Sequence, residues 1–457
     1  MSFHFRARRS RRETNMTEGC ISRHLIDFAM PLLIGNIFQQ LYNTVDTWVV
    51  GNYVSNEAFS AVGTVGPIIN MLIGIFMGLA SGAGVVISQY YGARRDQEVS
   101  DTVHTSMMMT LILAVVFTFL GIFIAPAMLH MMKTPDNVFP ESLAYLRIYF
   151  GGIVGLMVYN MGAGILRAVG DSQRPFYFLI VSAVINTILD LVFVLVFHMG
   201  VEGVAWATVI AQVVSAILTM YVLMRAHSSI RVNLSQLKIH MAEMKKIIRV
   251  GIPAAIQMAI TSFSNIFVQS YINYFGADCM SGWTAYAKID QLILLPMQSL
   301  ALSSTTFVGQ NLGANLPERA AKGIRVSLLL SVIATVVLMI PVLIFARPLV
   351  GFFNAKPEVV EYGATLLMWM SPFYVLCCVN QIYAGALRGA GNSKAPMIIM
   401  LASFVVFRQI YLYVMANFIS NEIIPIAMGY PAGWLICSAA TLIYYKHTSL
   451  TATRLVE

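Results

Sequence analysis

One ten-residue pattern occurs twice in this 457-residue chain, at positions 221 residues apart. The first copy runs from Leu166 to Pro175 and the second from Leu387 to Pro396, and both read Leu-Arg-x-x-Gly-(Asp/Asn)-Ser-x-x-Pro. Each copy leaves one long apolar segment and enters another. A polar turn repeated in this way predicts that the chain consists of two fused copies of one helical bundle.

Further matches follow the same spacing, so the repeat extends well beyond the turn. Gln89-Tyr90-Tyr91-Gly92-Ala93 matches Gln310-Asn311-Leu312-Gly313-Ala314 at the same offset of 221. Pro31 matches Pro253, and Ala125-Pro126 matches Arg347-Pro348, each at an offset of 222. Matches at four separate places make a chance origin of the repeat untenable.

The residues between these matches are too apolar to face water. Hydrophobic residues make up 58% of the chain and charged residues 11%, against roughly 25% charged residues in a soluble protein. Runs of about 20 apolar residues are long enough to span a bilayer as helices. Twelve such runs predict an all-α polytopic membrane protein, at residues 25–50, 58–87, 103–131, 143–165, 175–197, 202–224, 247–275, 281–308, 324–346, 360–386, 396–418 and 423–445.

Six helices in each half return the chain to its starting side, so both halves enter the membrane in the same orientation. This predicts a parallel repeat with a pseudo-twofold axis along the membrane normal. Lys and Arg concentrate in the segments that this topology places inside, which puts both termini in the cytoplasm and the protein in the plasma membrane. The expected division is a basic arm (1–16), an N-lobe (17–224), a linker (225–246), a C-lobe (247–446) and a tail (447–457).

The basic charge itself, a net +8, is mostly a consequence of this topology. The arginine-rich arm favours contact with anionic lipid rather than with nucleic acid.

A few polar residues lie inside the predicted spans, where a charge costs at least about 2.5–3.5 kcal/mol on insertion scales. Asp46 lies in the first span, Asn186 and Asp190 lie one helical turn apart in the fifth, and Thr208 lies in the sixth. Asp46, Asp190 and Thr208 each fall roughly 9 Å below the outer end of their helix. Their carboxylate, amide and hydroxyl oxygens predict a site for a small alkali cation such as Na⁺, or for a proton.

The second half carries different residues at the equivalent positions. Asn186 aligns with Phe407 or Arg408, and Asp190 with Tyr411 or Leu412. Two interpretations of Arg408 stay open: it contacts an anionic group of a substrate, or it pairs locally and locks helices. Lys288 is a second candidate for a C-lobe cavity, although a position at the membrane interface is favoured for it.

Two further features concern energy and motion. The chain has no G-x-x-x-x-G-K-(S/T) loop and no H-E-x-x-H motif, which argues against ATP hydrolysis and against an intramembrane enzyme. We therefore expect a secondary active transporter driven by an ion gradient, without a cofactor.

Pro31 removes a hydrogen bond early in the first helix and is a candidate hinge, or else a static kink.

The two repeated turns, the Q-x-x-G-A segments and the run Leu41-Tyr42-Asn43-Thr44-Val45-Asp46 resemble the multidrug and toxic compound extrusion (MATE) family over roughly residues 17–446. The resemblance implies two lobes that alternate access to a central cavity and export lipophilic, mostly cationic compounds in exchange for Na⁺ or H⁺. It places the family's ion site on Asp46, Asn186, Asp190 and Thr208, with Tyr42 and Asn160 in the neighbouring polar network and Pro31 as the bent proline.

The chain departs from the family pattern in the seventh helix, and this departure limits where we expect the coupling ion to bind. Some members carry a glutamate in the seventh helix, whereas the corresponding residues 260–265 here contain no acid. The chain therefore looks similar to the DNA-damage-inducible branch, which couples through the N-lobe. The expected partners are a small xenobiotic substrate and the lipid bilayer, and the expected state is a monomer. The alternative is a lipid-linked saccharide flippase of the same superfamily.

Overall fold

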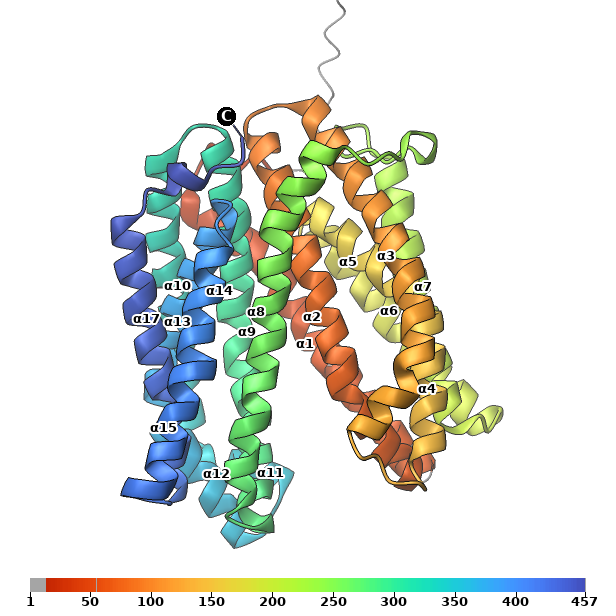
Figure 1. The fold of residues 1–457 in the computed structure, drawn as a ribbon, viewed down its shortest axis with the longest axis vertical. Coiled ribbons are helices and arrows are strands. Elements are labelled where there is room, and N and C mark those ends of the chain that lie inside the picture. Colours follow the sequence, from red (N-terminus) through yellow and green to blue (C-terminus); the bar gives the residue numbers. More distant parts are fainter. Residues whose placement is uncertain (1–13, 55, 457) are drawn as a thin grey trace, which may run out of the picture. The chain divides into compact units, whose positions relative to one another are not determined.

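The computed structural model describes residues 14–54 and 56–456. It leaves undescribed the side chains of residues 42, 43, 45–48, 50–52, 56, 57, 59, 260, 262, 263 and 266. Every regular element in the described part of the chain is a helix, which confirms the all-α prediction (Figure 1).

The chain divides into two units by its internal contacts. Unit 1 contains Ile34–Ile252 with the described residues before Met16, and unit 2 contains Met16–Leu33 and Pro253–Glu457. The boundaries fall inside α1 (Ile21–Tyr53) and α8 (Met241–Asn273), so each of these two helices contributes to both units. The predicted lobes 17–224 and 247–446 stay a prediction.

In unit 1 the core lies where α2, α3, α4, α5 and α7 meet, and Phe76, Leu146 and Phe150 are buried there. The remaining helices of this unit are α2 (Asn56–Gly92), α3 (Asp96–Met131), α4 (Phe139–Gly151), α5 (Ile153–Ala168), α6 (Gln173–Leu191), the π-helical η1 (Val192–Val196), α7 (Gly200–Met224) and the 3₁₀ turn η2 (Leu234–Gln236).

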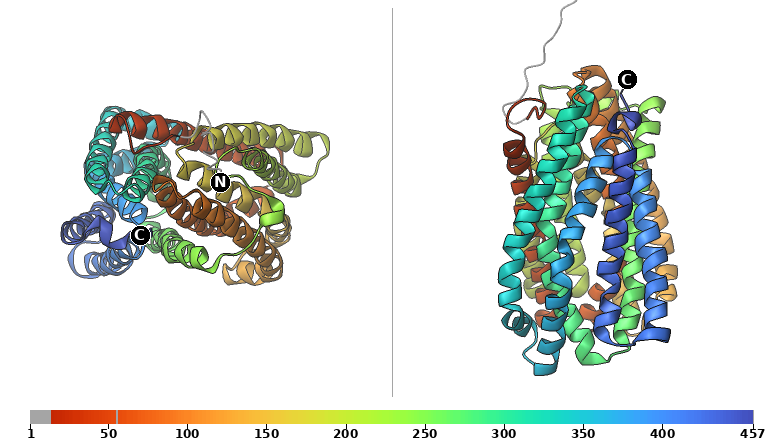
Figure 2. Two further views of the ribbon diagram at one scale, coloured as in Figure 1. Left: turned by 90° about the horizontal axis from the view of Figure 1, so that it is seen from above. Right: turned by 90° about the vertical axis from the view of Figure 1, so that its left-hand side faces the viewer.

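In unit 2 the long helices run side by side around α9 and α13, and Trp283, Leu367 and Tyr374 are buried between them (Figure 2). Its elements are α9 (Ala277–Gly313), α10 (Pro317–Ile344), α11 (Ala346–Phe353), α12 (Pro357–Met370), η3 (Ser371–Phe373), α13 (Tyr374–Gly389), α14 (Lys394–Met400), the π-helical η4 (Leu401–Phe407), α15 (Arg408–Val414), the π-helical η5 (Met415–Ile419), α16 (Ile423–Ala427), α17 (Gly429–His447) and η6 (Leu450–Thr453).

The two units repeat the same packing pattern. In unit 1, α5 packs on α2, α3 and α7, and in unit 2, α13 packs on α9, α10 and α17. The predicted fourth and tenth spans are each broken at the equivalent place. The first break separates α4 from α5 at Gly152 with a bend of 50°, and the second is the 3₁₀ turn that contains Pro372. A shared break at the same repeat position supports a common ancestral bundle.

Each repeated turn is a helix C-terminus of the Schellman type. Gly170 N donates to Arg167 O (3.0 Å) and Asp171 N donates to Leu166 O (3.0 Å), while Gly170 adopts φ +85°. The second turn has the same pair of bonds, from Gly391 N to Arg388 O and from Asn392 N to Leu387 O, with Gly391 at φ +92°. Glycine is required there because the position is left-handed.

The polar residue after each glycine begins the next helix. Asp171 Oδ1 accepts from the backbone N–H groups of Gln173 and Arg174, and Asn392 Oδ1 accepts from Ala395 N. A side-chain oxygen in this role satisfies helix N–H groups that have no partner within the helix. The repeated pattern is therefore a signal for stopping one helix and starting another.

The Gln-x-x-Gly-Ala segments end helices in the same way, although the left-handed residue is not glycine. Arg94 (φ +58°) follows α2, and Asn315 (φ +60°) follows α9. Arg95 N donates to Tyr90 O, and Leu316 N donates to Asn311 O. Both repeated signatures therefore have a structural explanation.

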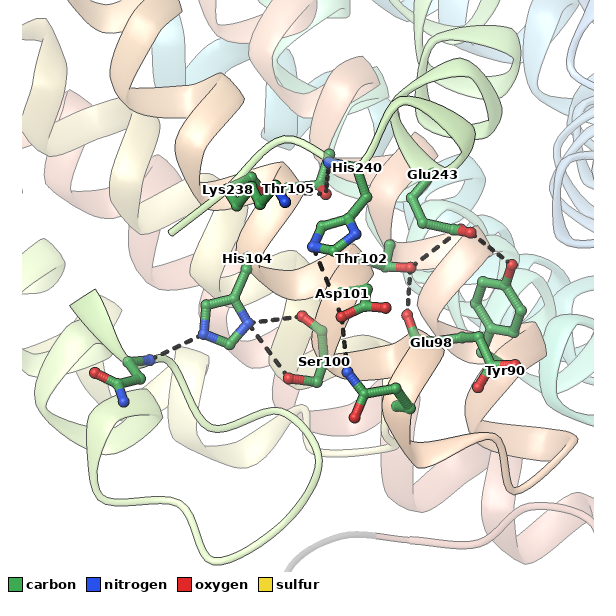
Figure 3. A network of polar contacts seen from close by, with 12 residues as sticks. Tyr90, Glu98, Ser100, Asp101, Thr102, His104, Thr105, Lys238, His240 and Glu243 are labelled. Atoms are coloured by element: carbon green, nitrogen blue, oxygen red, sulfur yellow. Dashed lines mark hydrogen bonds and ion pairs between the residues drawn. The ribbon is translucent and has the colours of Figure 1, made fainter. Parts of the chain in front are cut away.

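The segment between α7 and α8 is attached to unit 1 by a polar network (Figure 3). The N–H groups of Asn233 and His240 donate to His104 Nε2 (3.1 Å) and Thr105 Oγ1 (3.0 Å) of α3. At the start of α8, Glu243 accepts from Tyr90 (2.9 Å) and Thr102 (3.3 Å) (Figure 3). The first turns of α8 therefore belong to unit 1.

The helices have the length and composition of a membrane protein. Among the described residues, nine helices are long and apolar enough to cross a bilayer, or ten if the bent pair α4 and α5 forms one span. Helices α1 and α8 both contain residues whose side chains are not described, so twelve spans stay a prediction.

Candidate functional site

The polar residues predicted on the fifth span are buried in unit 1. They lie in the last turns of α6, which begins after the Asp171 cap and ends at the π-helical turn η1. Asn186 and Asp190 both have 0% exposure and are separated by one helical turn. Their shared face is the one that packs into unit 1, because the intervening Ile188 is 54% exposed.

Thr208 on α7 lies next to this face and is 4% exposed. Its hydroxyl donates to Val204 O (3.0 Å) of its own helix and accepts from Asn186 Nδ2 at 3.5 Å. The second distance is at the upper limit for a hydrogen bond. Three of the four residues predicted for an ion site, Asn186, Asp190 and Thr208, are therefore buried where α6 packs on α7.

The structure says less about the other residues predicted for this site. The side chains of Asp46 and Tyr42 lie outside the described residues, although the backbone of both is helical in α1. Asn160 on α5 donates to Leu156 O (2.9 Å), one turn back in its own helix. Pro31 lies within continuous helix α1, two residues before the boundary between the units.

The chemistry of the three buried residues is that of a hard-cation site. A carboxylate, an amide oxygen and a hydroxyl oxygen are donors that suit an alkali cation. A buried carboxylate costs free energy unless a proton, a cation or hydrogen bonds compensate its charge. No group of three or more His, Cys, Asp or Glu side chains that could hold a metal ion is found in the part of the chain that the structure describes.

The two cations predicted for unit 2 differ from each other in environment. Lys288 on α9 is exposed, whereas Arg408 on α15 is 2% exposed. Arg408 donates to the backbone oxygen of Phe404 (3.1 Å) and to the side chain of Ser264 (2.6 Å).

Sequence reasoning missed the residues that surround Arg408. Ser264 and Asn265 come from α8 and Tyr430 comes from α17, so they are distant in sequence. The unpaired charge of Arg408 inside a predicted span was the signal, but no motif indicated its neighbours.

One protein-family model matches this chain twice, once in each half. The MatE family model matches residues 31–192 and again 253–414, which is well over half of the chain. The two matches begin 222 residues apart, and this spacing equals the offset between Pro31 and Pro253. The prediction of two copies of one bundle is confirmed.

Two relatives from Bacillus subtilis are similar along almost the whole length. YoeA, a probable multidrug resistance protein, is 29% identical, with 94% of this chain and 95% of the relative covered. YpnP, also a probable multidrug resistance protein, is 26% identical, with 96% and 98% covered. A solved structure titled as the outward-facing conformation of a multidrug resistance MATE family transporter has the same fold, with a TM-score of 0.91, 20% identity and coverage of 98% and 99%. The chain therefore belongs to the MatE family, and it is a membrane transporter of this multidrug efflux family rather than an enzyme.

Proposed function

We propose that this transporter is an antiporter that exports lipophilic cationic compounds in exchange for Na⁺ or H⁺. The coupling ion binds Asp46, Asn186, Asp190 and Thr208. The observation that carries the proposal is the complete burial of Asn186 and Asp190 beside Thr208, because buried acids in membrane helices mark ion pathways. The description of YoeA and YpnP as probable multidrug resistance proteins supports the export of drugs.

The packing of α1 against α6 supports including Asp46 in this site. Thr14 N donates to Val169 O (3.1 Å), so the segment before α1 lies beside the turn that precedes α6. Further along, a Cβ at Gly35 would lie 3.4 Å from the side chain of Leu179. Equal steps from Gly35 and Leu179 reach Asp46 and Asp190, so the two acids share one level if the helices continue side by side.

Coupling requires that the ion binds two arrangements of the protein with different affinity. Asp190 is fixed on α6 within unit 1, whereas Asp46 is on α1, whose first part belongs to unit 2. An ion held by both carboxylates would link the shape of α1 to the occupancy of the site. Pro31, near the unit boundary, is the proposed hinge, and Tyr42 and Asn160 are proposed as supporting polar groups.

The remaining parts of the proposal concern topology. The transporter has twelve spans in the lobes 17–224 and 247–446, a parallel repeat, both termini in the cytoplasm and a monomeric state in the plasma membrane. Coupling through the N-lobe, as in the DNA-damage-inducible branch, agrees with the lack of an acid in residues 260–265.

Transport in proteoliposomes tests the function. We expect efflux of a cationic dye under either a Na⁺ or an H⁺ gradient applied separately, and whichever gradient drives it identifies the coupling ion. The variants Asp46→Asn and Asp190→Asn should each reduce gradient-driven efflux by about a hundredfold or more, since a neutral amide cannot replace the charge that binds the ion.

The control is Asp136→Asn, which neutralises an exposed acid in the segment between α3 and α4. It should keep wild-type efflux. Wild-type efflux from Asp46→Asn and Asp190→Asn would reject the ion site, and lack of efflux from the wild type under both gradients would reject the antiport mechanism.

A further inference from the structure

Arg408 is the largest fully buried side chain in the described part of the protein, and all of its contacts are neutral. Its Nε donates to Phe404 O (3.1 Å), and its Nη2 donates to Ser264 Oγ (2.6 Å) and Asn265 Oδ1 (3.4 Å). The guanidinium lies over the ring of Tyr430, 4.5 Å from its centre. These contacts orient the cation without neutralising it.

The charge of Arg408 is therefore not balanced by the described residues. No carboxylate among them lies within ion-pair distance of the guanidinium, and Nη1 has no hydrogen-bond partner among them. A guanidinium has five N–H donors in a fixed fork. A cation at membrane depth is costly, so a retained cation of this kind indicates a function.

Local backbone structure explains how Arg408 reaches this position. The preceding residues, Leu401–Phe407, form the π-helical segment η4, whereas the equivalent part of unit 1 lies in the regular α-helix α6. A π-helical turn holds more residues per turn and so rotates the residues that follow it. Short π-helical segments inside α-helices occur often at functional sites.

The two units thus carry opposite polarity at corresponding places. Unit 1 has Asn186 and the acid Asp190, both buried. At an offset of 222 residues, unit 2 has Arg408 and Leu412, also buried. A buried pair of an amide and an acid in one unit therefore corresponds to a buried cation and an apolar residue in the other.

Two further aromatic rings lie next to Tyr430. The Tyr430 ring lies 5.7 Å from Trp283 and 6.0 Å from Trp434, and its hydroxyl donates to Asn265 Oδ1 (3.3 Å). Asn265 is exposed, so the polar end of this cluster can be reached from outside unit 2. Aromatic walls beside one fixed charge are the usual lining of a site for a planar organic ligand.

We propose that Arg408, with Asn265 and Tyr430, binds the anionic group of an aromatic substrate. Carboxylates and phosphates accept paired hydrogen bonds from a guanidinium, and the neighbouring rings stack on the planar part of the ligand. The inference rests on the proposed export function and extends its substrates to planar anions and zwitterions.

Binding of two flavins that differ by one phosphate tests the proposal. Equilibrium dialysis of purified protein in nanodiscs compares riboflavin 5′-phosphate with riboflavin. We expect the wild type to bind the phosphorylated flavin about tenfold to a hundredfold more tightly, which is the range of a charge-assisted hydrogen-bond pair. Arg408→Gln should abolish this preference, and Arg408→Lys should retain part of it because the charge remains.

The matched control is Arg347→Gln, which removes a cation of unit 2 that is exposed and paired with Glu361 (2.8 Å). It should keep the preference. Size-exclusion profiles and thermal unfolding establish that each variant is folded. If Arg408→Gln does not fold, Asn265→Leu replaces it, because Asn265 is exposed and accepts from both Arg408 and Tyr430.

Equal affinity of the wild type for both flavins would overturn the proposal, and so would an unchanged preference in Arg408→Gln or its replacement. Cationic-dye efflux, measured after the same purified proteins are reconstituted into proteoliposomes, separates the two claims. Dye efflux without a phosphate preference rejects the anion site alone, whereas a phosphate preference without dye efflux rejects only the proposed exchange.

Discussion

The glycine in each repeated turn has a backbone conformation that other residues adopt at a cost. Gly170 and Gly391 both have φ near +90°, and both contact the backbone of a chain end. A Cβ at Gly170 would lie 2.5 Å from Thr14 O, and one at Gly391 would lie 2.6 Å from Thr453 O. The glycines therefore serve two purposes, the left-handed turn and the close approach of a terminal segment.

Gly170→Ala should lower the thermal stability of the protein in detergent. The left-handed conformation alone costs about 1–2 kcal/mol for an L-residue, and the contact with Thr14 adds to this. The control is Gly63→Ala in α2, where a Cβ would meet nothing within 4 Å and helix propensity favours alanine. Equal melting temperatures for the two variants would contradict this explanation of the turn.

Thr208→Val is a milder test of the ion site than removal of an acid. Valine has the shape of threonine but provides no oxygen, so Asn186 loses its acceptor and the ion loses a ligand. We expect the apparent affinity for the coupling ion to fall by about threefold to tenfold. Dye efflux measured against ion concentration gives this affinity.

Thr219→Val provides the matched control for that variant. Thr219 is also buried on α7 and also donates to the carbonyl one turn back, Ser215 O (2.7 Å). Its replacement should therefore cost similar stability without changing ion affinity. A similar loss of affinity in both variants would show that the effect is structural.

At the scale of elements, the contacts of α8 divide the helix between the two units. Its first turns are attached to α2 and α3 through Glu243, which is 7% exposed and accepts from Tyr90 and Thr102. Lys246 also donates to the Tyr90 hydroxyl and lies over its ring. The residues after Pro253 belong to unit 2. The polar network therefore holds the start of α8 in unit 1.

Glu243→Ala should loosen this attachment. The Tyr90 hydroxyl loses its acceptor, at a cost of about 1–3 kcal/mol for a buried group left unsatisfied. The Thr102 hydroxyl loses a weaker bond and keeps the one to Glu98 O (2.7 Å). Amide hydrogen exchange of the linker 225–246 should become faster. Asn233 and His240 of the linker bond to α3, the helix that Glu243 also contacts through Thr102. Glu98→Ala, which removes a half-exposed acid of α3 with only a 3.9 Å contact to Arg95, is the control. Unchanged exchange in Glu243→Ala would contradict the role of the network.

At the scale of the whole molecule, the first part of α1 belongs to unit 2 and the first part of α8 belongs to unit 1. Met16, Leu25 and Phe28 pack with Phe307 in unit 2, and Ser303 donates to Leu25 O (3.1 Å). Arg319 adds bonds to the backbone oxygens of Met16, Glu18 and Gly19. The first part of α1 is therefore fixed in unit 2, although the rest of the helix belongs to unit 1.

A protease site inserted between Ser235 and Gln236 tests this exchange, because both residues are exposed. After cleavage, the two fragments should elute together in detergent, since each carries a helix segment packed in the other's unit. Leu25→Ala should promote separation by removing a buried side chain, whereas Ile26→Ala, at an exposed neighbour, should not. Fragments that separate without any substitution would contradict the packing of α1.

Much of the architecture was predictable, because a bilayer requires long apolar helices and a repeat requires similar packing in both halves. Asn186, Asp190 and Thr208 could be selected because polar side chains are rare in such helices. The π-helical segment before Arg408 and the partners of Glu243 could not be predicted. Both depend on contacts between residues more than a hundred positions apart.

The amino-acid sequence alone determined the helical class, the two-copy organisation and the helix ends, because these follow from local composition, periodicity and capping. Only the tertiary structure decided that α1 and α8 each contribute to both units, and that Arg408 is surrounded by neutral partners. These features depend on which side chains meet after folding. The burial of the Asp190 carboxyl and of the Arg408 guanidinium is likewise a property of the packed molecule.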